Sequence, residues 1–254
     1  MLDQILTINI FVFMLIFSRV GTMFFLFPGF RGKQVNIRTR LSIALALAFI
    51  LTPLLADELP GLPKTTMMLF ALIMGEVLAG AIIATVALIL FSAVQTTGTV
   101  IAFISAMANS LVFDPISEQQ SAIVAGFLTT TATLLIFVTG LHHVFIRAMI
   151  DSYAIFQPGV TPEISDAMAL ITRTVSETFK IGVQLAAPFI VVSIVYNLVL
   201  GVMTRLSPQI PIFFVAMPAQ IVVAIVLLMI TVPAIMMAFM NYVQDGLLPF
   251  VSAP

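Results

Sequence analysis

The chain has no cysteine among its 254 residues, and charged residues make up only 8% of it. Without cysteine, the chain can form neither disulfides nor thiolate metal sites. Its formal net charge of -1 provides no electrostatic basis for binding nucleic acid. Soluble domains carry roughly 25% charged residues. The chain therefore lacks the polar surface that a soluble protein requires.

Hydrophobic residues make up 61% of the chain and gather in long runs. A helix of about 20 predominantly apolar residues spans a bilayer, and lipid offers exposed backbone amides no other partner. We therefore expect an all-α, polytopic membrane protein built from helical hairpins, with about six spans. The candidates, of which 95–113 is the weakest, are residues 4–27, 41–56, 65–94, 95–113, 122–147, 183–204 and 212–243. Prolines inside the apolar runs predict kinked helices that pack against protein: Pro188, Pro218 and Pro233.

Basic residues are concentrated between the first two spans, where no acidic residue occurs. They are Arg31, Lys33, Arg38 and Arg40. The positive-inside rule predicts that this loop is cytoplasmic. The count of spans then puts the segment 105–122 and Arg205 on the inner side and both chain ends outside. The opening residues MLDQ are acidic and no small-residue cleavage site follows, so we expect no removable signal peptide.

An amphipathic helix is predicted over residues 161–182. Thr161 is suited to the N-cap and Pro162 to the first helical position. Apolar residues follow at spacings of three and four, which form one stripe: Ile164, Met168, Ile171, Val175 and Phe179. Charged residues occupy the other faces. The simpler interpretation is a helix on the membrane surface or packed on the protein, and the alternative is a helix that docks a partner.

Two ionisable residues, Arg19 and Glu76, fall inside apolar runs. Burying either one alone in a membrane is costly, so each should face a partner, a cavity or another subunit. The two could pair with each other. A proton relay is the weaker interpretation of Glu76, because no chain of acidic residues or histidines accompanies it.

Signatures of catalysis and metal binding are missing from the sequence. The adjacent pair His142 and His143 would point about 100° apart on a helix, and no carboxylate pair or HExxH pattern completes a metal site. No GxSxG, phosphate-binding loop or dinucleotide fingerprint occurs. We therefore expect a protein that is not an enzyme and that needs no metal or other cofactor.

The segment SAMANSLVFDPISEQQSA, residues 105–122, interrupts the apolar sequence. The sequence has no charged residue over 77–113 and none over 119–146, so the charges of the segment stand alone between two long uncharged stretches. Asp114-Pro115 is predicted to end one helix, because the residue before proline disfavours the α region. Ser117 and Gln120 have the spacing of a capping box that opens the next helix. The segment is either a plain surface loop or a functional element that lies inside something polar.

Three stretches resemble one known family, and they occur in the same order over nearly the whole chain. They are LVFDPISEQQSAIVAGF, MIDSYAIFQPG and RLSPQIPIFFVAMP. This sequence resembles the FliR/SctT family of flagellar and virulence type III secretion export gates. Some members carry Asn where this chain has Pro211, and Gly where it has Ala216, which leaves only the local turn open.

The resemblance implies a single membrane-embedded domain over residues 1–254, acting as the one R copy in a closed, helical multi-subunit assembly. The expected partners are the P and Q subunits (FliP and FliQ), FlhB and FlhA, together with unfolded export substrates and membrane lipid. The expected location is the bacterial inner membrane at the flagellar basal body. We prefer this flagellar function; the alternatives are a virulence-type homologue, a self-contained small-solute carrier that uses Arg19 and Glu76, and a scaffold that lines no path.

The resemblance also implies that the segment 105–122 is a plug inside the gate, surrounded by a gasket of methionines from the P subunits. The segment is polar where it would meet water, and apolar side chains beside it could seal the gate. The predicted plug residues are Phe103, Met107, Asn109, Phe113, Asp114, Pro115, Glu118 and Gln119.

Overall fold

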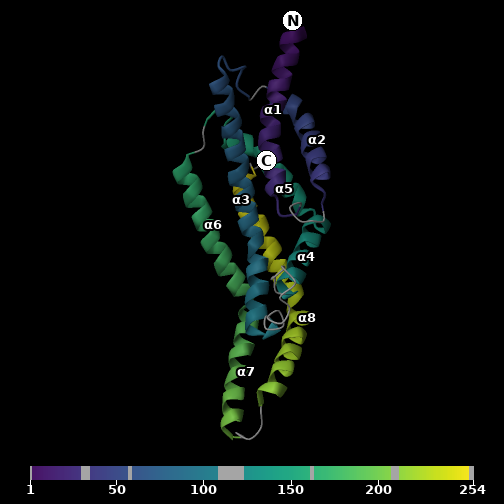
Figure 1. The fold of residues 1–254 in the computed structure, drawn as a ribbon, viewed down its shortest axis with the longest axis vertical. Helices are drawn as coiled ribbons and strands as arrows, with labels where there is room; N and C mark the ends of the chain where they lie inside the picture. Colours follow the sequence, from purple (N-terminus) through teal and green to yellow (C-terminus); the bar gives the residue numbers. More distant parts are fainter. Residues whose placement is uncertain are drawn as a thin grey trace. The chain divides into compact units, whose positions relative to one another are not determined.

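A computed structural model of the protein describes residues 2–29, 35–56, 59–107, 123–160, 163–206 and 212–251. These residues form helices joined by short turns and contain no strand (Figure 1). The prediction of an all-α protein is confirmed. The helices are α1 (Leu2–Leu26), α2 (Ile37–Leu55), α3 (Thr66–Ile104), α4 (Ile123–Val138), α5 (Leu141–Ile155), α6 (Ile164–Leu185), α7 (Ala187–Leu206) and α8 (Ile212–Leu247), followed by the short 3-10 helix η3 (Leu248–Phe250).

Several helices are long and apolar enough to cross a membrane. Within the described residues there are four of them, α2, α3, α7 and the helix that contains α8. A fifth span results if α4 and α5, which meet at a bend of 73°, are counted as one broken span. Residues Ile10–Leu26 of α1 form a shorter apolar helix. The chain is therefore a polytopic membrane protein, as predicted.

The boundaries of the predicted spans need two corrections. Residues 65–94 and 95–113 do not form two spans, because α3 runs without a break for 39 residues and ends at Ile104. The threonines in its second half do not interrupt it, since Thr96, Thr97 and Thr99 donate their hydroxyls to carbonyls of the preceding turn. Conversely, the predicted span 122–147 is broken at Gly140, whose φ of 78° is the left-handed conformation that glycine adopts readily.

Proline has two different positions in the predicted kinked segments. Pro218 and Pro233 lie inside α8, as predicted. Pro188 also accompanies an interruption, but at a helix start: it is the second residue of α7, just after Ala186 separates α6 from α7. A proline in the first turn removes no intrahelical hydrogen bond.

Helix α6 buries a different face from the one that its sequence indicates. The predicted apolar stripe is largely exposed, with Ile164, Met168, Val175 and Phe179 at 70%, 60%, 50% and 63% exposure. The buried positions are Thr174, Thr178 and Gly182. The stripe therefore does not pack on this chain, which leaves lipid or a partner to cover it. The predicted cap residues Thr161 and Pro162 lie outside the described residues.

The helices belong to two compact units. Unit 1 consists of Met1–Leu90, Ile136–Val175 and Val243–Pro254, and unit 2 of Phe91–Leu135 and Ser176–Tyr242. In unit 1, α1 packs beside α2 (Figure 1), and the rings of Phe27 and Phe145 stack with their centroids 3.7 Å apart. In unit 2, Phe91 and Phe239 meet edge to face at 5.8 Å. Each unit thus has an apolar core of its own; that the chain acts as one domain stays a prediction.

Candidate functional site

The predicted plug begins where α3 ends. The last helical residue is Ile104, and the backbone N–H of Ser105 donates to the carbonyl of Ile101 at 3.0 Å. Ala106 then adopts a φ of 59°, the left-handed region that ends many helices but that residues with a Cβ rarely enter. The helix therefore ends at Ile104, and the prediction that Asp114-Pro115 ends it is wrong.

Two side chains from other helices hold this end of α3. The carbonyl oxygen of Ile104 accepts one hydrogen bond from Ser193 Oγ of α7, at 2.9 Å, and another from Gln220 Nε2 of α8, at 2.8 Å. Carbonyls in the last turn of a helix have no intrahelical partner, and leaving one unsatisfied in an apolar environment costs several kcal/mol. These two bonds satisfy the carbonyl at which α3 ends.

The two helices that supply these donors are themselves joined. The Tyr196 hydroxyl of α7 donates to the carbonyl of Ala216 in α8, and the two helices lie side by side in Figure 1. The point where the chain leaves α3 is therefore fixed by a hydrogen-bonded hairpin. Sequence analysis missed Ser193 and Gln220; the available signal was a polar side chain inside each of two long apolar runs.

Only the first of the predicted plug residues are described. Phe103 is 70% exposed on the last turn of α3, and Met107 is half-buried just beyond it. The others lie outside the described residues: Asn109, Phe113, Asp114, Pro115, Glu118 and Gln119. The structure thus describes how the segment 105–122 is anchored at its start, and its role as a plug stays a prediction.

The intramembrane charges Arg19 and Glu76 form a buried ion pair. Arg19 Nε donates to Glu76 Oε2 at 2.7 Å, and the two side chains are only 1% and 2% exposed. This contact joins α1 to α3 within unit 1. The close approach depends on a glycine, because a Cβ at Gly80 would lie 2.7 Å from the carbonyl oxygen of Arg19. The sequence-based expectation that each charge faces a partner is correct.

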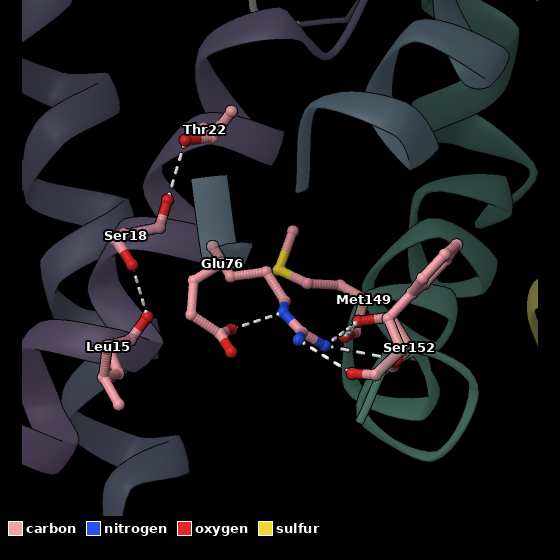
Figure 2. Close-up of polar contacts among 8 residues, drawn as sticks. Leu15, Ser18, Thr22, Glu76, Met149 and Ser152 are labelled. Carbon is pink, nitrogen blue, oxygen red and sulfur yellow. Dashed lines mark hydrogen bonds and ion pairs between the residues drawn. The ribbon is translucent and has the colours of Figure 1, made fainter. Parts of the chain in front are cut away.

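The remaining nitrogens of Arg19 bind the C-terminal end of α5. Nη1 donates to the Ser152 carbonyl at 3.2 Å, and Nη2 donates to the Phe156 carbonyl at 2.8 Å. Glu76 and Ser152 lie on opposite sides of this network in Figure 2. The C-terminus of a helix carries a partial negative charge, so it attracts a cation. Arg19 therefore caps α5 as well as pairing with Glu76.

An aromatic ring completes the surroundings of the arginine. The guanidinium carbon of Arg19 lies 4.0 Å from the centroid of the Tyr153 ring, within the range of a cation–π interaction. The network thus joins α1, α3 and α5 through one residue. Each nitrogen of an arginine guanidinium can donate, and those of Arg19 bind a carboxylate, two carbonyls and the Ser152 hydroxyl. The arrangement is that of a structural joint.

The two histidines make local contacts. His142 Nδ1 lies 3.3 Å from the Ile136 carbonyl, and His143 Nδ1 lies 3.1 Å from the Gly140 carbonyl. Their rings are tilted by 37° to each other, with centroids 4.0 Å apart. Over the part of the chain that the structure describes, no group of three histidine, aspartate or glutamate residues is placed to hold a metal ion.

Comparison with known proteins identifies the family. A family described as bacterial export proteins, family 1, matches residues 10–246. The flagellar biosynthetic protein FliR of Caulobacter vibrioides is 36% identical over 237 residues, which cover 93% of this chain and 94% of that protein. FliR of Aquifex aeolicus is 27% identical, covering 91% and 89%, and FliR of Escherichia coli is 27% identical, covering 82% and 79%. The chain belongs to family 1 of the bacterial export proteins, together with these FliR proteins.

Proposed function

We propose that the protein is a subunit of the flagellar export gate in the bacterial inner membrane, at the basal body. It forms part of the closed portal through which unfolded flagellar proteins leave the cell, and the segment 105–122 is the plug. The supporting relatives are flagellar biosynthetic proteins. The observation that supports the plug is the bonded carbonyl of Ile104. It accepts hydrogen bonds from α7 and α8 at the end of α3, directly before the polar segment begins.

Exposed apolar surface supports a multi-subunit assembly. Only 6% of the apolar stretch of α7 is buried within the chain, and only 17% of the apolar stretch of the span that contains α8. Phe214 of α8 is 83% exposed and Leu206 of α7 is 77% exposed. Such surface needs lipid or other apolar helices as neighbours. We assign part of it to FliP and FliQ, with FlhB and FlhA as further neighbours of the assembled gate.

Purification through a tag on this chain tests the assembly. We expect one copy of the chain to co-purify with several copies each of FliP and FliQ, as counted by the mass of the intact complex. A stable monomer that transports a small solute in liposomes would contradict the proposal and favour the carrier.

Deletion of residues 110–119 tests the plug. The assembled gate should become permeable to ions, measured as conductance in planar bilayers. A variant that replaces the same residues by a glycine–serine linker of equal length is the matched control, because it keeps the connection and removes the side chains. If deletion and linker both leave conductance unchanged in a normally assembled complex, the segment is no plug and the protein is a scaffold.

A further inference from the structure

Unit 1 contains an apolar groove between α1 and α2 that the proposed function does not use. Its volume is about 630 Å³, within the range of small-molecule sites, and Val77 of α3 also lines it. Its floor is buried, with Phe24 at 2% and Ala44 at 3% exposure, and its edges are open, with Leu41 at 51%. The groove is also lined by Phe17, Ser18, Gly21, Thr22, Phe25 and Arg40.

The polar residues of α1 do not make this groove polar. Ser18 Oγ donates to the Leu15 carbonyl at 2.7 Å, and Thr22 Oγ1 donates to the Ser18 carbonyl at 2.7 Å (Figure 2). Both hydroxyls are thus satisfied within their own helix. They require no polar group from an occupant, so the groove between the helices suits a hydrocarbon chain.

One end of the groove carries a positive charge. Arg40 lies in the first turn of α2 and lines the groove. Its Nη2 donates to the Val35 carbonyl at 3.2 Å, and its guanidinium carbon lies 5.7 Å from the centroid of the Phe25 ring, so the group is held at the groove rather than extended into solvent. No acidic residue occurs in the sequence between Asp3 and Asp57. The end of the groove therefore favours an anion.

The size of the groove argues against a protein helix as its occupant. A helix with side chains is about 10–12 Å across, so 630 Å³ would hold only about one turn. A flexible acyl chain, in contrast, can enter a narrow groove between two helices. An apolar slot with a fixed cation at its end matches a lipid that has a negatively charged headgroup, and basic pockets between membrane helices are known to bind such headgroups.

We infer that the groove between α1 and α2 is a specific site for an anionic phospholipid. One acyl chain lies between Phe17, Gly21 and Leu41, and the phosphate lies beside the guanidinium of Arg40. The site shares no residue with the Arg19 network or with the segment 105–122. Lipid binding can therefore be measured separately from the export function.

Native mass spectrometry of the full-length chain, in the assembly with which it co-purifies and after removal of endogenous lipid, measures this binding directly. The probes are palmitoyl-oleoyl phosphatidylglycerol, phosphatidylcholine with the same chains, and glycerol 3-phosphate as a headgroup without chains. We expect saturable binding of one phosphatidylglycerol per copy of this chain, weaker binding of phosphatidylcholine, and none of glycerol 3-phosphate.

Two pairs of variants separate the headgroup contact from the acyl-chain contact. Arg40→Gln should weaken phosphatidylglycerol binding roughly fivefold, the effect of about 1 kcal/mol for one basic residue near a membrane surface, while leaving phosphatidylcholine binding unchanged. Arg38→Gln removes the same charge from a neighbouring exposed position outside the groove and should change binding less than twofold.

Gly21→Leu should abolish binding of both lipids. A Cβ at this position meets only the Phe17 ring, at 3.6 Å or more, so the added side chain fits the helix and fills the groove. Gly201→Leu is the matched control, because nothing lies within 4 Å of a Cβ there. If Gly21→Leu fails to assemble, the Arg40 and Arg38 variants decide alone.

Equal binding of both phospholipids in every variant would overturn the inference, since it would indicate ordinary solvation by lipid. A photo-crosslinker at Leu41 gives an independent result. Its transfer to phospholipid supports the inference, and transfer to a co-purified protein overturns it by placing a protein segment in the groove.

Discussion

The two units of the chain hold their helices together by different means. In unit 1, a buried arginine joins α1, α3 and α5 through an ion pair and two carbonyls. In unit 2, neutral hydrogen bonds from Ser193 and Gln220 join α7 and α8 to the end of α3. A buried charge that loses its partner is far more costly than a neutral group that loses one of two bonds. Unit 1 is therefore held in one arrangement, whereas the neutral joint at the start of the segment 105–122 can be released at lower cost.

The largest expected effect comes from breaking the ion pair. Glu76→Leu leaves Arg19 buried without its carboxylate and should lower the free energy of unfolding by about 3–5 kcal/mol. The double variant Arg19→Met with Glu76→Leu should recover most of this loss, since neither charge remains. Denaturation in mixed micelles, followed by circular dichroism, measures both. Additive effects of the two substitutions would show that the pair does not act as a unit.

Close packing in unit 2 gives the next effect. A Cβ at Gly98 would lie 2.4 Å from Cα of Ala125, so Gly98→Ala must push α3 and α4 apart and should cost about 1–3 kcal/mol. Gly126→Ala is the matched control, because nothing lies within 4 Å of a Cβ at that position. The control should be neutral or slightly stabilising in the same denaturation experiment. Equal behaviour of the two variants would argue against this contact.

The neutral joint should be less sensitive. Gln220→Leu removes one of the two donors to the Ile104 carbonyl and should cost about 1 kcal/mol, the typical worth of one hydrogen bond. Thr231→Val is the control, since Thr231 Oγ1 also lies on α8 and donates to the Leu227 carbonyl of its own helix. If this joint positions the plug, Gln220→Leu should raise ion leakage through the assembled gate more than the control does. Unchanged leakage would separate the joint from gating.

The smallest effect is expected for a charge pair on the surface of α5. Arg147 Nε and Asp151 Oδ2 are 3.7 Å apart, and the arginine is 55% exposed. Arg147→Ala should change the free energy of unfolding by less than about 0.5 kcal/mol. The same chemical groups would thus matter greatly as Arg19–Glu76 and little here. A loss above 2 kcal/mol in the denaturation experiment would contradict this contrast.

The sequence predicted correctly what depends on local chemistry. Apolar runs predicted an all-α membrane protein, and the isolated charges at Arg19 and Glu76 predicted that each needs a partner. The sequence could not show that Arg19 also caps α5, because its two closest acceptors there are backbone carbonyls, which no residue type marks. The same limit explains the error at the end of α3. Asp114-Pro115 is a local signal, whereas the donors that satisfy Ile104 come from residues 193 and 220.

Helix α6 shows a second limit of pattern-based prediction. Its period-3.6 stripe identified a helix correctly, but the pattern alone left open whether the apolar face meets the membrane, this protein or a partner. In water an apolar face must turn inward, but in lipid or beside partner helices it has no such requirement. Small and hydroxyl-bearing residues such as Thr174 and Thr178 then provide the face that packs on the chain itself.

The position of Arg19 has a consequence for biosynthesis. During translation this arginine enters the membrane 57 residues before Glu76 and 133 residues before Ser152. A lone arginine at mid-membrane costs about 2.5–3.5 kcal/mol in insertion experiments. The groups that satisfy this arginine are therefore synthesised after it, and α1 is stabilised in the folded chain by a carboxylate from α3 and by carbonyls at the end of α5.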